Sequence, residues 1–177
     1  MRLLAISLLA LGLAAPASAA APRFGVYDLA TDVAGASTNE YGDVSVAGDK
    51  ESLGRRARGA TVVRCGQDCR LGRGWIAFAK PSVLRAGDVR AATAHASGYG
   101  WAVTVRLSAH GQGAWDRFDR AARGRQKRNG VPDVLAVVLD GTVDALPYAV
   151  DTRRSGNTLE LSGFTRAGAH AAAKLLG

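Results

Sequence analysis

Beyond its first twenty residues, the sequence lacks any apolar run long enough to span a bilayer. The first twenty have the pattern of a secretory signal peptide: Arg2 supplies a positive start, residues 3–15 are apolar, and residues 16–20 are small, in an A-x-A pattern. No cysteine follows the apolar run, so lipid attachment there is not expected. The sequence therefore predicts an exported protein, periplasmic or extracellular, that is soluble after cleavage near Ala19.

Cysteine and histidine are scarce, with two and three residues among 177. Cys65 and Cys69 form the one cysteine pair, and neither a second pair nor two histidines at ligand spacing accompany it, which disfavours a zinc site. In an exported chain an even cysteine count predicts a disulfide. So small a loop would stabilise the fold by about 2 kcal/mol or less. We expect a Cys65–Cys69 disulfide, no metal and no other cofactor.

Motifs for nucleophilic catalysis are also missing. There is no nucleophile elbow and no glycine-rich oxyanion loop. His110 near Ser108 and Asp116 is the one grouping that suggests nucleophile chemistry, and His95 lies in a strand pattern as a core or edge residue. Asp140 is explained by its turn, because aspartate tolerates left-handed backbone. The sequence predicts a protein that is not an enzyme.

Acidic residues are outnumbered, 15 against 23 Lys and Arg, giving a net charge of +8 and a pI near 10.2. Such a charge suggests nucleic acid, an anionic membrane or an acidic polymer as partner, or else only a solubilising surface. No base-reading motif is present, so nucleic acid is not expected. The densest charge either complements a helix C-terminus or forms a docking patch for anionic lipid, cell-wall polymer or acidic polypeptide. Its residues are Arg117, Arg120, Arg123, Arg125, Lys127 and Arg128.

The most informative stretch is residues 134–150, VLAVVLDGTVDALPYAV. Residues 134–139 form an apolar, β-branched run typical of a buried strand. Asp140-Gly141 then predicts a type I′ hairpin turn, which needs positive φ at both central residues. The second run contains Pro147, which cannot donate to a ladder, so we expect it at a sheet edge.

The other elements follow from hydrophobic periodicity. Strands are expected at residues 23–29, 60–64 and 75–79, the second and third flanking the cysteine turn, with a hairpin of alternating pattern over residues 89–108. Helical spacing of Trp115, Phe118 and Ala122 predicts a helix, and a final helix is expected after Thr165. The predicted fold is α+β, an antiparallel sheet with two helices on one face. A loop-rich region at residues 21–74 is expected to precede the main domain at residues 75–177.

Three segments together resemble the head subdomain of the first extracytoplasmic domain of SecD, a subunit of the protein-export machinery that also occurs fused as SecDF. They are LAVVLDGTVDALP (residues 135–147), LELSGFT (residues 159–165) and the terminal helix ending AKLL. The resemblance covers roughly residues 75–176 and implies a ferredoxin-like head. It departs from the family in lacking transmembrane helices, and in having Gly168 where a capping-box glutamate is expected.

The resemblance implies no catalytic residue. It implies an affinity for unfolded secreted polypeptide, with a membrane export component as a second possible partner. The expected mode is β-strand addition to the proline-containing edge strand. The residues expected to bind are Val143, Leu146, Pro147 and Tyr148.

Overall fold

The computed structural model describes residues 22–29, 61–65, 74–78, 80–98, 100–149, 152 and 154–177. The predicted signal peptide (residues 1–20), Cys69 and most of the loop-rich region lie outside the described residues, so those predictions are not tested. Within the described residues, no helix has the length and apolar character needed to cross a membrane. The elements in chain order are β1 (Phe24–Asp28), β2 (Thr61–Cys65), β3 (Gly74–Phe78), β4 (Leu84–Arg85), η1 (Ala86–Asp88), β5 (Val89–Ser97), β6 (Gly100–Leu107), α3 (Ala109–Asn129), β7 (Leu135–Leu139), β8 (Thr142–Ala145), β9 (Arg154–Ser155), β10 (Thr158–Phe164) and α4 (Arg166–Leu176).

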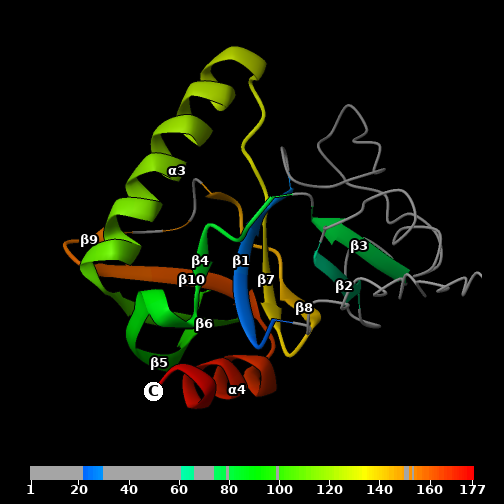
Figure 1. Ribbon diagram of the computed structural model, residues 1–177. Coiled ribbons are helices and arrows are strands. Elements are labelled where there is room, and N and C mark those ends of the chain that lie inside the picture. Colours follow the sequence, from blue (N-terminus) through cyan, green and yellow to red (C-terminus); the bar gives the residue numbers. More distant parts are fainter. Residues whose placement is uncertain are drawn as a thin grey trace, which may run out of the picture.

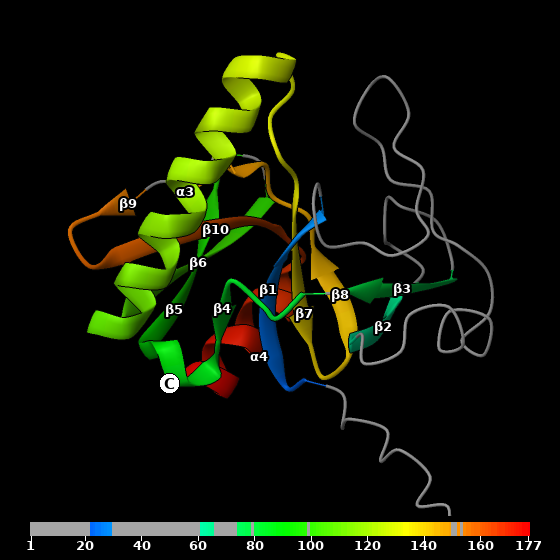
Figure 2. The same ribbon diagram turned by 45° about the horizontal axis from the view of Figure 1, so that its top comes forward.

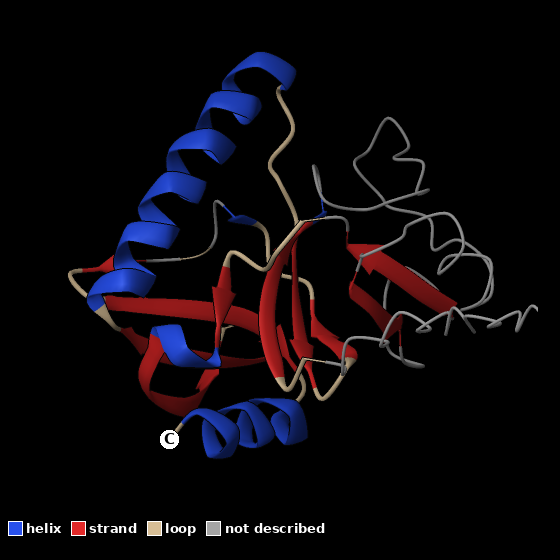
Figure 3. Ribbon diagram, in the orientation of Figure 1, coloured by secondary structure: helices blue, strands red, loops and turns tan. Residues whose placement is uncertain are grey.

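The strands form two sheets, seen in Figures 1 and 3. The larger has the order β3-β2-β8-β7-β1-β4, and the smaller has the order β5-β6-β10-β9. β1 pairs with β7 along its whole length, from Phe24 opposite Leu139 to Asp28 opposite Leu135. Strands from before residue 74 therefore share a sheet with strands from after it. The division of the chain at residue 74 remains a prediction.

The central hairpin forms as its sequence predicts. β7 is buried throughout, and β8 folds back on it through Asp140 and Gly141, whose φ angles are 43° and 76°. Positive φ at both positions is what a type I′ turn requires, and it explains why an Asp-Gly pair stands here.

The expectation of one sheet is wrong. The β7–β8 hairpin belongs to the six-stranded sheet, whereas the β5–β6 hairpin and β10 belong to the four-stranded one. The local patterns predict each hairpin correctly, but they carry no information on which hairpins pair with each other. The structure is a mixed α+β arrangement of two sheets and two helices within the described residues. A ferredoxin-like head is not confirmed by it.

The edge position expected for β8 is also wrong. β8 pairs antiparallel with β7 on one side and parallel with β2 on the other, through Arg64 opposite Thr142 and Cys65 opposite Val143. Pro147 does not mark an edge because it lies after the end of β8, where its missing N–H removes no ladder bond. Its carbonyl still accepts a hydrogen bond from the Leu135 N–H at 2.8 Å.

The main core lies where the helices meet both sheets (Figure 2). The predicted face of α3, made of Trp115, Phe118 and Ala122, is buried, as are Ala169 and Ala172 of α4. The same cluster includes residues of both sheets, such as Val26, Val137, Val105 and Leu159. A second cluster on the other face of the larger sheet includes Tyr27, Val63, Ile76, Phe78 and Val138. The rings of Tyr27 and Phe78 stack there at 4.2 Å.

Candidate functional site

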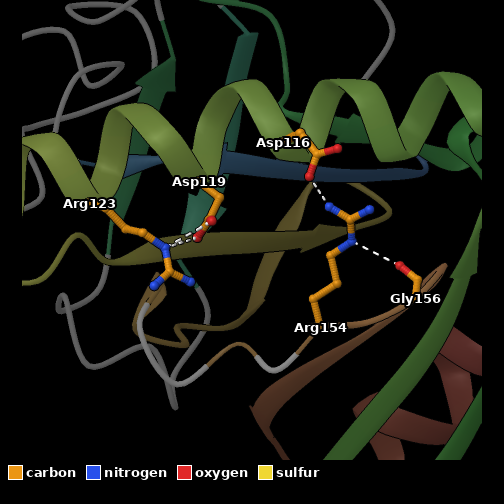
Figure 4. Close-up of polar contacts among 5 residues, drawn as sticks. All are labelled: Asp116, Asp119, Arg123, Arg154 and Gly156. Atoms are coloured by element: carbon orange, nitrogen blue, oxygen red, sulfur yellow. Dashed lines mark hydrogen bonds and ion pairs between the residues drawn. The ribbon is translucent and has the colours of Figure 1, made fainter.

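The grouping that suggested nucleophilic chemistry does not form. His110 Nδ1 lies 2.6 Å from Oδ1 of Asp88, a residue that is only 4% exposed, while Asp116 pairs with Arg154 (Figure 4). Ser108 is the N-cap of α3, where its hydroxyl accepts a backbone N–H from the first turn at 3.1 Å. Histidine and serine therefore serve two separate structural contacts at the start of the same helix.

A small hollow of about 60 Å³ lies beside α3. Its lining contains no serine, threonine, cysteine or lysine, and its charged side chains are engaged in ion pairs with neighbours. Across the described ranges, no group of three or more His, Cys, Asp or Glu is placed to hold a metal ion. The lining residues are Asp119, Ala122, Arg123, Gln126, Asp133 and Ala149.

Cys65 ends β2 and is 3% exposed in the second core cluster. β2 and β3 form the antiparallel pair expected on either side of the cysteine turn, with Cys65 opposite Gly74. Because Cys69 lies outside the described residues, the disulfide remains a prediction.

Arg125 points inward, away from the patch in which the sequence places it. Its Nη2 donates to Asp28 Oδ2 at 2.5 Å and to Asp133 Oδ2 at 2.6 Å, and its Nε donates to Asp133 at 2.9 Å. Asp28 and Asp133 are 3% and 6% exposed. The guanidinium thus joins the last third of α3 to the end of β1 and to the segment before β7.

A second member of the basic run is paired within the helix. Arg123 Nε donates to both carboxylate oxygens of Asp119 at 3.0 and 2.9 Å, and these hydrogen bonds raise the pKa of Arg123 (Figure 4). Asp116, one turn earlier, is held by Arg154 of β9 (Figure 4). The rest of the run is exposed and has no ion pair among the described residues. These four residues are Arg117, Arg120, Lys127 and Arg128.

The four residues expected to bind a peptide do not form a common exposed surface. Val143 and Pro147 are buried and Leu146 packs against the second core cluster, whereas Tyr148 is 47% exposed. Strand addition at β8 is therefore not supported by its position, since β2 already pairs with Val143.

Asp144 of β8 lies against the first turn of α4. A Cβ added to Gly168 would overlap its carboxylate, whose Oδ2 is buried without a hydrogen-bond partner. Burial raises the pKa of Asp144 above its usual value. The Thr165 hydroxyl caps the helix by accepting the Gly168 N–H at 3.1 Å. Gly168 therefore leaves space in the first turn of α4 for the carboxylate of Asp144 from β8. This is the position at which a capping-box glutamate was expected.

β5 is an edge strand, and this the sequence analysis missed. Among the described strands it pairs only with β6. On the far side of β6, Leu107 N donates to Asn157 O at 2.8 Å. Backbone N–H and C=O groups alternate sides along a strand, so those of Thr104, three residues before Leu107, point toward β5. Thr104 lies opposite Thr93, and the backbone groups of Thr93 therefore point back toward β6. The N–H and C=O groups that point away from β6 belong to the intervening residues Ala92, Ala94 and Ala96.

The edge of β5 carries few of the features that protect natural edges. It is nine residues long, with one Lys or Arg residue, Arg90, and no proline, whereas the other edge strands of the described sheets are shorter: β3 has five residues, and β4 and β9 have two each. α4 packs against β5, and its end places Gly177 close to the Ala92 carbonyl. His95 of β5, a residue of this edge strand, lies with its Nε2 3.3 Å from Oε2 of Glu160 on β10.

None of the family models and none of the curated proteins compared with this chain matches it. Among solved structures, a crystal structure of SecDF in a super-membrane-facing form is similar, with a TM-score of 0.42 and 20% sequence identity. The similarity covers 72% of this chain and 14% of that one, so the chain spans a small share of SecDF. The match fits a SecD-like domain only loosely.

Proposed function

We propose that this chain is an exported, non-enzymatic domain related to the SecD head, and that it binds unfolded polypeptide by adding it as a strand to β5. Strand addition needs an edge whose backbone groups are unpaired and unprotected. The observation that carries the proposal is the edge of β5, where Ala92, Ala94 and Ala96 each direct one donor and one acceptor outward.

Two further observations support the proposal. Along Ala94 and Ala96 the approach to the backbone is open, because alanine side chains are short and that of Ala94 packs toward the core, whereas the end of α4 lies near the Ala92 carbonyl. The motifs at residues 135–147 and 159–165 resemble SecD, whose family handles exported polypeptides. The same resemblance makes a membrane export component a second partner to test.

The proposal is tested by backbone amide NMR on the chain from residue 21, because every described residue follows that position. Titration with a reduced, alkylated and permanently unfolded polypeptide should shift the resonances of residues 90–97. The amides of Ala92, Ala94 and Ala96 should exchange more slowly with solvent when the polypeptide is bound. Residues 142–148 should change little, because β8 is already paired.

Ala94→Pro tests the mode of binding, since it removes an outward N–H while leaving the bonds to β6 in place. We expect it to weaken polypeptide binding at least about tenfold. Thr93→Ala is the matched control, because the Thr93 backbone faces β6, and it should retain affinity. If Ala94→Pro does not fold by circular dichroism, Ala96→Pro near the strand end replaces it. Unchanged affinity in a folded proline variant, or shifts confined to other elements, would refute the proposal.

A further inference from the structure

Four cations of α3 lie on one side of the helix. At 3.6 residues per turn, Arg117, Arg120, Lys127 and Arg128 fall within an arc of about 100°. The buried residues Trp115, Phe118 and Ala122 fall on the opposite side. We call the four cations the α3 basic face. It points away from the core, and the end of α3 projects beyond both sheets (Figures 1 and 2).

The charge of this face is not compensated within the described residues. α3 contains two acidic residues. Asp116 is paired with Arg154, and Asp119 is paired with Arg123. None of the four cations has an ion pair there, and all are exposed. A cluster of unpaired like charges destabilises a helix surface by mutual repulsion, and an anionic partner relieves that repulsion.

The face is also flat. Two glycines lie on the same side of the helix, Gly113 one turn before the first cation and Gly124 between Arg120 and Lys127. The nearest side-chain atoms to their missing Cβ positions are guanidinium nitrogens. Arg117 Nη1 is 3.5 Å from the position at Gly113, and Arg128 Nη1 is 3.6 Å from that at Gly124. The arginines therefore extend along the helix over backbone that carries no side chain. Such a face fits a planar array of negative charges better than it fits a pocket-bound anion.

An exposed apolar side chain follows the last turn of α3, which carries Lys127 and Arg128. Gly130 ends α3 in the left-handed conformation, with φ of 73°, and Val131 follows at 37% exposure. Val131 is one of two large hydrophobic side chains exposed in the described part of the chain. An exposed apolar group beside cations is typical of a membrane surface contact, because it enters the interface while the charges meet the head groups.

We infer that the α3 basic face, together with Val131, docks the protein on the surface of an anionic lipid bilayer. The contact is peripheral, since the apolar face of α3 is already buried in the core and cannot insert. This inference uses a different element from the β5 edge and does not depend on polypeptide binding. Each basic residue near an anionic membrane strengthens binding about fivefold, so four together contribute several hundredfold.

Vesicle sedimentation tests the inference with the chain from residue 21. The protein should bind vesicles of phosphatidylglycerol and phosphatidylcholine, but not phosphatidylcholine alone. The variant with all four cations changed to glutamine should bind the anionic vesicles at least about a hundredfold more weakly. The matched control changes four exposed cations elsewhere to glutamine, with the same loss of net charge, and should bind nearly as well as wild type. Its positions are Arg64, Arg90, Arg106 and Lys174.

Further measurements distinguish binding to a lipid surface from binding to a soluble anionic polymer. Val131→Ser should weaken vesicle binding about threefold and leave binding to polyphosphate unchanged. Equal losses in the two quadruple variants would show that net charge alone acts, and would overturn the inference. Binding to polyphosphate without binding to anionic vesicles would overturn it in favour of an envelope polymer. Absence of wild-type binding at physiological salt would overturn it as well.

Discussion

Among single residues, Asp144 has the least favourable environment for its charged side chain. Its Oδ2 is buried without a hydrogen-bond partner, and burial raises its pKa. The carboxylate lies at the first turn of α4, where the helix dipole favours negative charge. Desolvation opposes that effect and determines the direction of the shift, so folding makes the charged form of Asp144 less favourable than it is in the unfolded chain.

We therefore predict that Asp144→Asn stabilises the protein at neutral pH. A carboxyl whose pKa is higher in the folded than in the unfolded state binds more protons in the folded state. The free energy of unfolding therefore falls as pH rises from the unfolded pKa to the folded pKa, and the loss persists at higher pH. The free energy of unfolding in urea should be higher for the variant at pH 7, and the difference should vanish near pH 3. A variant that is less stable at pH 7 would mean that the helix dipole outweighs desolvation.

Between elements, the ion cluster of Arg125 with Asp28 and Asp133 is the most consequential contact. It joins α3 to β1 and to the segment before β7, although Asp28 lies 97 residues away in sequence. A buried ion pair adds little net stability over an apolar equivalent, but breaking one leaves a buried charge unpaired. Here the cation neutralises two carboxylates that are each almost fully buried.

Arg125→Ala should accordingly lower the free energy of unfolding by about 3–5 kcal/mol. Arg123→Ala is the matched control two residues earlier. Arg123 is exposed and its partner Asp119 is only partly buried, so little change is expected. Both are measured by urea denaturation at pH 7. Similar midpoints for the two variants would contradict the structural role assigned to Arg125.

In the whole molecule, one core connects the two sheets. Val26 and Val137 of the larger sheet share a cluster with Val105 and Leu159 of the smaller one, and α3 contributes Trp115 to it. Because neither sheet can lose this contact without exposing the buried face of the other, we expect them to unfold together.

Tryptophans in different sheets can report on this cooperativity. A variant that keeps only Trp75, in β3, and one that keeps only Trp101, in β6, place the probe in the larger and the smaller sheet. In each variant the fluorescence transition in urea should coincide with the loss of far-ultraviolet circular dichroism. Transitions that separate in either variant would show that the two sheets are independent units.

Features of the fold that depend on residues close together in the sequence could be predicted from the sequence alone. The Asp-Gly turn, the alternation along β6 and the buried face of α3 are all confirmed. Each depends on backbone preference or side-chain period over a few residues, which the chain carries locally. The candidate patch on α3 was predicted as a run, but its six members could not be sorted into paired and unpaired cations.

The features on which the proposals and predictions rest were decided by the tertiary structure. β5 is an edge and β8 is not, because sheet order depends on which strands bury each other's faces across the whole chain. Arg125 turns inward because Asp28 and Asp133 are buried beside it, and Asp144 fills the space at Gly168 because β8 passes the start of α4. Long-range burial selects these partners, and local periodicity does not encode it.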